Sequence, residues 1–300
     1  MDLNTFIVSV FCLVDDRLEA KRIRQRGPAP KLSDSEVITM EVVGEFLGID
    51  TDKGLYEFFR RHYYAEWFPK LKELHRTTFA RQAANLWKVK EFLWQRLLKY
   101  DLLLGAQEGV EEPLLVIDSF PIAVCKKSRS YKCRVMRELS ARGRDTNLGK
   151  FLGMRAHVLI VWPGIIVRAN VHDLHLAGRL LEGIGRGWVL ADRNYWSPLL
   201  REQLQDHEEG PMLMARFKIK NATEKERGLV WPRWLSARRQ KIESVFSQLA
   251  SRFNMKTVRA RDTWHFSSRF LRKILSHTMA VMFCRKEGIA PTKFWELLTD

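Results

Sequence analysis

"GWVLADRNYW" (residues 187–196) joins a short apolar run, typical of a buried strand, to a carboxylate, Asp192. A second apolar run, "LLVID" (residues 114–118), also ends on an aspartate, Asp118. In each run the acid comes two positions after an apolar residue that faces the same side of the strand. Both aspartates are therefore expected to project from a sheet face near a strand end.

A third acid, Glu243, lies in "RRQKIESVFSQL" (residues 238–249), which is predicted to be helical. Glu243 comes one residue after an apolar position, about 100° around the helix, so it lies at the border of the inward face. Arg239 precedes it by one turn and can pair with its carboxylate. The inward face is formed by Ile242, Phe246, Leu249 and Phe253.

Two strand-end aspartates and one helix-border glutamate suit hard divalent cations. Mg²⁺ prefers oxygen ligands, and two ions about 4 Å apart can stabilise both the attacking and the leaving oxygen at phosphorus. Without a cation such a cluster is costly, because like charges raise one another's pKa. Each aspartate alone is ordinary at a strand end. Their joint occurrence predicts a site for two Mg²⁺ ions, for which Mn²⁺ is expected to substitute.

The charge distribution indicates an anionic polymer as partner. The chain has 51 Lys and Arg against 35 Asp and Glu, a net charge of +16. Residues 1–112 hold 17 basic and 18 acidic residues, whereas residues 113–300 hold 34 and 17. The C-terminal two-thirds is therefore expected to bind the phosphates of double-stranded DNA.

Within that region, residues 125–150 carry nine Lys and Arg against two acids. Such a run can be a solvated loop, but beside a candidate catalytic strand we favour contact with nucleic acid. The residues predicted to contact DNA lie in this run and at a few later positions: Lys126, Lys127, Arg129, Lys132, Arg134, Arg193, Tyr195, Arg238 and Arg252.

Residues 1–112 carry helical patterns and are predicted to form a separate DNA-binding domain. "LSDSEVITMEVVGEFLGI" places Ser33 three residues before Glu36, a capping-box spacing. "TTFARQAANLWKVKEFLWQRLLKYDLL" predicts one or two further helices that begin at Thr77 or Thr78. Short helices of this kind fit either a helix-turn-helix DNA reader or a plain helical bundle.

Residues 113–300 alternate strand and helix patterns and predict an α/β domain with a mixed sheet. "GMRAHVLIVW" and "GIIVRANVH" predict a hairpin that turns at Pro163–Gly164. "GWVLA" and "PMLMARFKI" predict further strands, and "DLHLAGRLLEGI" predicts a helix. Two long helices are predicted from "ARRQKIESVFSQLASRF" and "SSRFLRKILSHTMAVMFCRK".

Other classes of site are not indicated. The four cysteines form no CxxC pair, which argues against a zinc finger or a disulfide framework. No P-loop, dinucleotide fingerprint or GxSxG motif occurs, so no nucleotide cofactor and no acyl chemistry are expected. The apolar run "FIVSVFCLV" is too short to cross a bilayer, so no membrane partner is expected. His157 is expected to be a hydrogen-bonded core residue.

Residues 113–287 resemble the catalytic domain of DDE-type insertion-sequence transposases, most closely the insertion-sequence nine-eight-two group. The matching stretches, in order, are "VIDSFPIAVC", "FLGMRAHVLIV", "ANVHD", "VLADRNYWS", "RRQKIESVF" and "FLRKILSHT". The resemblance implies an RNase H-like fold in which Asp118, Asp192 and Glu243 form the catalytic and metal-binding triad, assisted by Arg239.

The resemblance also implies Mg²⁺-dependent strand cleavage and strand transfer at terminal inverted repeats, with a homodimer on DNA. It implies a prokaryotic, cytoplasmic and nucleoid-associated protein. The sequence departs from the family pattern at Ala250, where a lysine is usual, and at Arg193 and Asn194, where Lys-Gly is usual. Three alternatives stay open: a catalytically inactive or repurposed DNA-binding protein, a nuclease that performs no strand transfer, and a basic globular protein whose acids never meet.

Overall fold

The computed structural model divides the chain into two compact units, Met1–Leu103 with Gln248–Asp300, and Leu104–Ser247. Each unit is considered by itself. The structure describes residues 1–18, 29–63, 65–98, 114–145, 148–161, 165–170, 180–181, 184, 187–192, 195, 210–215, 233–291 and 293–299, with backbone only at 165, 167–170, 233–236 and 238–241.

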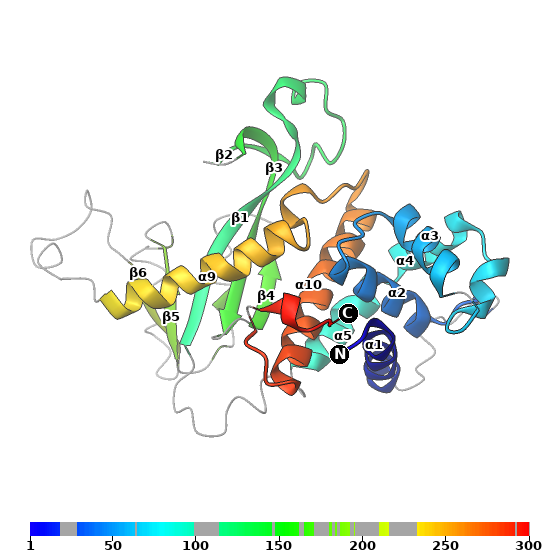
Figure 1. Cartoon of the computed structure of the whole chain (residues 1–300). Coiled ribbons are helices and arrows are strands. Elements are labelled where there is room, and N and C mark those ends of the chain that lie inside the picture. The colour runs from blue at the N-terminus through cyan, green and yellow to red at the C-terminus, as the bar shows by residue number, and fades with distance from the viewer. Residues whose placement is uncertain are drawn as a thin grey trace, which may run out of the picture. The chain divides into compact units, whose positions relative to one another are not determined.

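The first unit is helical. Its helices are α1 (Leu3–Leu18), α2 (Asp34–Phe46), α3 (Asp52–His62), α4 (Arg76–Asn85), α5 (Trp87–Leu97) and α10 (Thr263–Lys286), with the short η1 (Pro69–Glu73), η7 (Met255–Thr257) and η8 (Phe294–Glu296). Figure 1 shows α10 running beside α5 and α2, against which it packs. Among the described helices, none combines the length and apolar character needed to cross a membrane.

The ends of two helices test the predicted caps. At α2 the capping box is confirmed: Ser33 Oγ accepts from the Glu36 amide at 3.1 Å, and the Glu36 carboxylate accepts from the Ser33 amide at 2.6 Å. At α4 the prediction of Thr77 or Thr78 as first residue is wrong. The cap is His75, whose Nδ1 accepts from the Thr77 amide at 3.3 Å, so the helix begins one residue before Thr77.

A buried ionic cluster joins the C-terminal helix to the N-terminal helices. On α10, Arg272 Nε donates to Glu45 at 2.5 Å, and Lys273 Nζ donates to Glu45 at 2.7 Å and to Asp50 at 2.6 Å. Arg272 also pairs with Asp52 at 2.7 Å. Burial opposes the charge of Arg272, but the adjacent carboxylates raise the pKa of its guanidinium.

The same cluster extends to α5, where Lys90 Nζ donates to Glu41 at 2.7 Å and to Ser268 Oγ at 2.7 Å. Burial lowers the pKa of Lys90 and raises that of Glu41, and the attraction between the two opposes both shifts. The prediction that residues 113–300 form one domain is therefore corrected. Residues 248–300 belong to the helical unit, because the buried cations of α10 are neutralised by carboxylates of α2 and of the segment that follows it.

The second unit contains a six-stranded mixed sheet in the order β2-β3-β1-β5-β6, with β4 paired to β3. β1 runs antiparallel to β3 and parallel to β5, which is parallel to β6. The mixed sheet and the β3–β4 hairpin confirm the predictions. The elements are β1 (Leu114–Lys126), η3 (Lys127–Arg129), β2 (Ala141–Asp145), β3 (Gly149–Val161), β4 (Ile165–Asn170), β5 (Trp188–Ala191), β6 (Met212–Ala215) and α9 (Arg233–Ser251), whose last four residues are assigned to the first unit. The predicted turn at 163–164 and most of the predicted helix 173–184 lie outside the described residues.

The β1–β3 ladder continues well beyond the parallel part of the sheet. β5 pairs with β1 only up to Ile117, whereas the β1–β3 pairing reaches Lys126. A register shift between Ala123 and Cys125 bends this extension. Opposite the shift, Gly153 allows close approach, because a Cβ there would lie 2.1 Å from the carbonyl oxygen of Ile122. The extension carries the basic segment away from the part of β1 that pairs with β5 (Figure 1).

Candidate active site

The structure brings the two predicted aspartates side by side. The last paired row of the parallel strands β1 and β5 joins Ile117 to Ala191. Asp118 and Asp192 are the next residues on the two strands, so they occupy adjacent positions about 4.8 Å apart at the same sheet edge. Both side chains are half-buried. The strand-end prediction holds for Asp192 but is wrong for Asp118, because β1 continues past Asp118 to Lys126 through its pairing with β3.

Tyr195 fixes the turn that follows Asp192. Its amide donates to the Asp192 carbonyl at 2.9 Å, and its phenol lies 2.8 Å from Nδ1 of His157 on β3. The phenol also hydrogen-bonds to Ser119. Burial raises the pKa of the Tyr195 phenol, and the neighbouring charges of Asp118 and Asp192 raise it further.

The prediction that Tyr195 contacts DNA is wrong. The side chain is 5% exposed and lies edge-on to the imidazole of His157, with ring centroids 5.8 Å apart. His157 itself is 1% exposed, which confirms the expectation of a hydrogen-bonded core histidine. The pair therefore supports the site from within the core, where a charged phosphate would be costly to bury.

Two further residues near the aspartates escaped the sequence patterns. Ser119 donates its amide to Asp118 Oδ1 at 2.7 Å, which orients that carboxylate. Arg155 on β3 donates Nη1 to Ser119 Oγ at 3.2 Å, and its charge lowers the pKa of Tyr195, against the larger effect of burial. Arg155 could have been found from the sequence, because it is a charged residue inside the apolar strand "GMRAHVLIV". A half-buried arginine in a strand needs a nearby polar partner.

Helix α9 covers the sheet face that carries Asp118. Phe120 and Asp118 are two residues apart on β1 and so share a face, and Phe120 packs edge-on against Phe246 of α9, with centroids 5.2 Å apart. Figure 1 shows α9 crossing β1. Glu243 precedes Phe246 by three residues, about 4.5 Å along the helix axis. The predicted inward face is confirmed at Ile242, which is 3% exposed.

Glu243 does not complete a metal-binding set in this structure. Its side chain is exposed. Across the part of the chain that is described, no three His, Cys, Asp or Glu side chains lie close enough together to hold one metal ion. The adjacent Asp118 and Asp192 offer the oxygen donors that Mg²⁺ prefers, so two of the three predicted ligands fit such an ion. The side chain of Arg239 lies outside the described residues.

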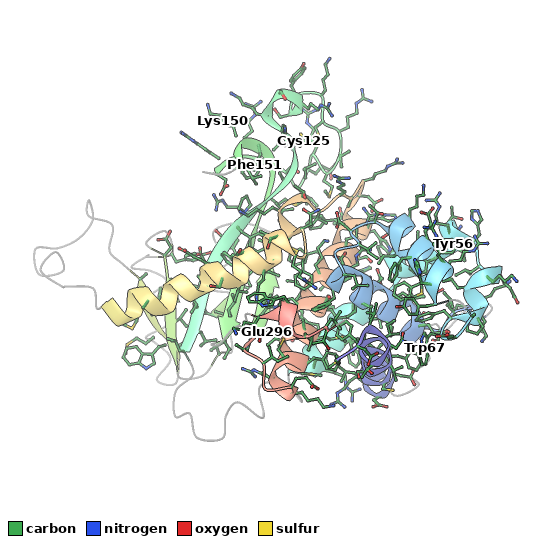
Figure 2. All side chains as sticks on the ribbon, in the orientation of Figure 1. Tyr56, Trp67, Cys125, Lys150, Phe151 and Glu296 are labelled. Atoms are coloured by element: carbon green, nitrogen blue, oxygen red, sulfur yellow. The ribbon has the colours of Figure 1, made fainter. Side chains whose placement is uncertain are left out.

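The basic segment lies at the end of the β1–β3 extension, where Figure 2 shows Cys125, Lys150 and Phe151. All five cations predicted there to contact DNA are exposed: Lys126, Lys127, Arg129, Lys132 and Arg134. Arg193 and the side chain of Arg238 lie outside the described residues. Arg252 differs from the prediction, because it is half-buried in the helical unit with its guanidinium 4.4 Å from the centre of the Phe46 ring.

A family model described as "Transposase DDE domain" matches residues 108–263, just over half of the chain and a span that contains both aspartates and Glu243. The chain belongs to the DDE transposase family. The prediction from the ordered motifs is thereby confirmed at family level. Members of this family depend on divalent metal ions.

The fold of this transposase is similar to that of a solved protein, the piggyBac transposase in a cryo-EM structure of its synaptic complex with hairpin DNA. The TM-score is 0.50 at 10% sequence identity, and the match covers 98% of this chain and 76% of the other. This likeness supports the predicted RNase H-like, mixed-sheet core. A search of curated proteins finds no significant match to this transposase.

Proposed function

We propose that this transposase cleaves DNA strands and transfers them at the terminal inverted repeats of an insertion sequence, with Asp118, Asp192 and Glu243 as its catalytic carboxylates. One observation carries the proposal: the two aspartates follow the last paired row of neighbouring parallel strands. Carboxylates fixed at one sheet edge are suited to chemistry at a phosphodiester. Membership of the DDE transposase family supports the same reaction class.

The residues around the aspartates hold them in place. Ser119 orients the Asp118 carboxylate through its amide, and Tyr195 ties the turn after Asp192 to His157. Two bound Mg²⁺ ions, or Mn²⁺ in their place, would supply an activated water or 3′-hydroxyl and would stabilise the leaving oxygen. Fixed ligands of this kind reduce the reorganisation needed during the reaction.

Glu243 is the proposed third carboxylate, brought to the aspartates by a small movement of α9. The Phe120–Phe246 contact already holds the helix over the correct face of β1. Asp118 is two residues from Phe120, about 6.6 Å along β1. Glu243 is three residues from Phe246, about 4.5 Å along the axis of α9. Arg239, one turn before Glu243, is proposed to orient that carboxylate or a phosphate.

Double-stranded DNA, both element end and target, is the proposed partner. The extension places Lys126 about 26 Å of strand beyond Asp118, so one duplex can reach both the exposed cations and the aspartates. Joining two ends requires two active sites, and we therefore propose a homodimer on DNA. The proposed setting is the nucleoid in the cytoplasm of a prokaryote.

The test is cleavage of the DNA that flanks the protein's own gene, incubated with Mg²⁺ or Mn²⁺, with the ends mapped at nucleotide resolution. We expect cuts at the terminal repeats and joined 3′ ends in target DNA. Asp118→Asn and Asp192→Asn should abolish both products and leave DNA binding intact. Glu138→Gln, an exposed acid on the same unit, is the matched control. Full activity of Asp118→Asn would refute the site.

A DNA-binding protein without catalysis is the second candidate. It is favoured by the exposure of Glu243 and by the lack of a three-ligand metal set among the described side chains. The same experiment distinguishes the two candidates, because a catalytically inactive protein shifts the DNA in a gel but produces no nicks with either Mg²⁺ or Mn²⁺. Cutting without joined products would instead indicate a nuclease.

A further inference from the structure

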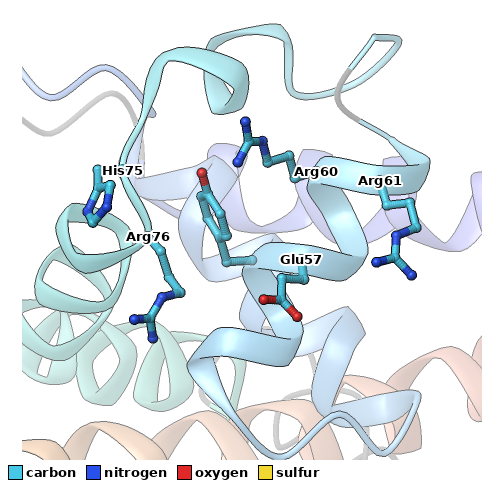
Figure 3. Close-up of a pocket in the computed structure, with 6 residues that line it drawn as sticks. Glu57, Arg60, Arg61, His75 and Arg76 are labelled. Atoms are coloured by element: carbon cyan, nitrogen blue, oxygen red, sulfur yellow. The ribbon is translucent and has the colours of Figure 1, made fainter.

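A cavity in the helical unit, separate from the aspartates, offers a second site. It has a volume of about 520 Å³ and lies between α3 and the beginning of α4. Figure 3 shows Arg60 and Arg61 on one side, His75 and Arg76 on the other, and Glu57 between them. The lining residues are Tyr56, Glu57, Arg60, Arg61, His75 and Arg76.

The cavity is strongly basic. Arg60, Arg61 and Arg76 are exposed, and none of them forms an ion pair with another described residue. The one acid in the lining, Glu57, pairs with Lys53 at 3.6 Å. Three arginines therefore line one cavity, although residues 1–112 are almost balanced in charge. Such a cluster is repulsive by itself and is stabilised by a bound anion.

The cavity walls are held in place before any ligand binds. Tyr56 Oη donates to the carbonyl of Leu74 at 2.6 Å, which ties α3 to the segment that leads into α4. Arg60 lies over the Tyr56 ring at 5.7 Å from its centre. Because Nδ1 of His75 accepts from the Thr77 amide, the neutral imidazole carries its proton on Nε2 and keeps one donor.

This lining fits a phosphodiester better than a free nucleotide. Guanidinium groups match phosphate oxygens in geometry and charge. A nucleotide base would need a stacking surface, but the only aromatic carbocycle in the lining, that of Tyr56, is 5% exposed. The open rim formed by exposed arginines is suited to a continuous backbone that passes over it.

We propose that this cavity, the arginine pocket, binds a backbone phosphate of duplex DNA through Arg60, Arg61 and Arg76. The inference rests on the proposed function, since it assumes that DNA is the partner. It adds a contact on the helical unit to those of the β1–β3 extension. Phosphate contacts set position and affinity rather than sequence preference.

The first test measures binding of a fluorescein-labelled duplex of mixed sequence to the full-length protein over a range of salt concentrations. Arg60→Ala with Arg76→Ala should weaken binding about tenfold and reduce the slope of log K against log salt by about 0.9 for each phosphate that the protein no longer neutralises. Arg81→Ala, which removes an exposed arginine of α4 outside the pocket, is the matched control. Unchanged affinity and slope in the double variant would overturn the inference, as would an equal loss in the control.

A second test needs no variant. Phenylglyoxal modifies exposed arginines, and mass spectrometry then compares Arg60, Arg61 and Arg76 with Arg81 in the presence of duplex or of inorganic phosphate. Selective protection by duplex supports the inference, whereas equal protection by inorganic phosphate, or none by duplex, overturns it. The proposed function is tested separately by cleavage: a wild-type protein that binds duplex through the pocket but never cuts would refute that function and leave this inference standing.

Discussion

The phenol oxygen of Tyr195 lies 2.8 Å from Nδ1 of His157, and this bond couples the turn after Asp192 to the strand next to β1. Because both residues are buried, neither can reach DNA directly. Their effect on catalysis must pass through the position of Asp192, whose carbonyl accepts from the Tyr195 amide.

Tyr195→Phe is therefore expected to slow strand cleavage by about tenfold or more, because Asp192 loses a fixed position, and to leave DNA affinity unchanged. The loss in folding stability should be about 1 kcal/mol, typical of one buried hydrogen bond. Single-turnover cleavage and urea unfolding measure the two effects. Tyr131→Phe, at a tyrosine that is 66% exposed, is the control. A wild-type cleavage rate in Tyr195→Phe would show that the hydrogen bond has no positioning role.

The ionic cluster predicts a large loss of stability when one cation is removed. Lys273→Met leaves Glu45 and Asp50 short of a partner inside the helical unit, which should cost about 3–5 kcal/mol in the free energy of unfolding. Lys286→Met, at an exposed position on the same helix, should change it by less than about 0.5 kcal/mol. Similar urea midpoints for the two variants would contradict a structural role for the cluster.

His277 predicts a loss of stability in mild acid. Burial lowers its pKa from 6.5 to about 3, and neither ring nitrogen has a hydrogen-bond partner among the described residues. The folded state keeps the imidazole neutral while the unfolded chain binds a proton below pH 6.5. Above pH 6.5 the neutral His277 costs the folded state nothing. As the pH falls from 6.5 towards 3, the free energy of unfolding decreases, by about 2 kcal/mol at pH 5.

The measurement is the free energy of unfolding in urea at pH 7 and pH 5, for the wild type and for His277→Phe. The variant retains an aromatic ring between Phe253 and Phe294 but cannot titrate. Its stability should fall less between the two pH values than that of the wild type. Parallel losses would assign the acid sensitivity to other groups.

Gly153→Ala should distort the extension that carries the basic segment. The new Cβ would lie 2.1 Å from the Ile122 carbonyl oxygen, a backbone atom that cannot rotate away. We expect a loss of about 1–3 kcal/mol, the usual range for overpacking, together with weaker DNA binding. Thermal unfolding and gel shift measure these effects. An unaltered melting temperature would mean that the β1–β3 pairing adapts to the new methyl group at no cost, through the register shift between Ala123 and Cys125.

Local patterns were sufficient where the determining contacts are local. Apolar runs identified the strand that contains Asp118 and the strand that ends just before Asp192, and the spacing of Ser33 and Glu36 identified the beginning of α2. Two adjacent parallel strands then place the aspartates together without further information.

Patterns failed where the partner is distant in the sequence. The bond between His157 and Tyr195 joins residues 38 positions apart, and the pairing of Glu45 with Lys273 joins residues 228 positions apart. No periodicity in "FLRKILSHT" distinguishes a buried lysine from a solvated one. The placement of α10 in the helical unit, and the packing of Arg252 on Phe46, therefore became visible only in the structure.

The membership of residues 248–300 in the helical unit has a consequence for biosynthesis. During translation, Glu45 leaves the ribosome long before Arg272 and Lys273 exist to neutralise it, and the whole aspartate-bearing unit is made in between. The helical unit can close only when the last part of the chain emerges, because its acids resist burial without their cations. A product released early by a stop codon before α10 would contain Asp118, Asp192 and Glu243 but would lack a complete helical unit, so both units can fold only in a chain that is translated to its end.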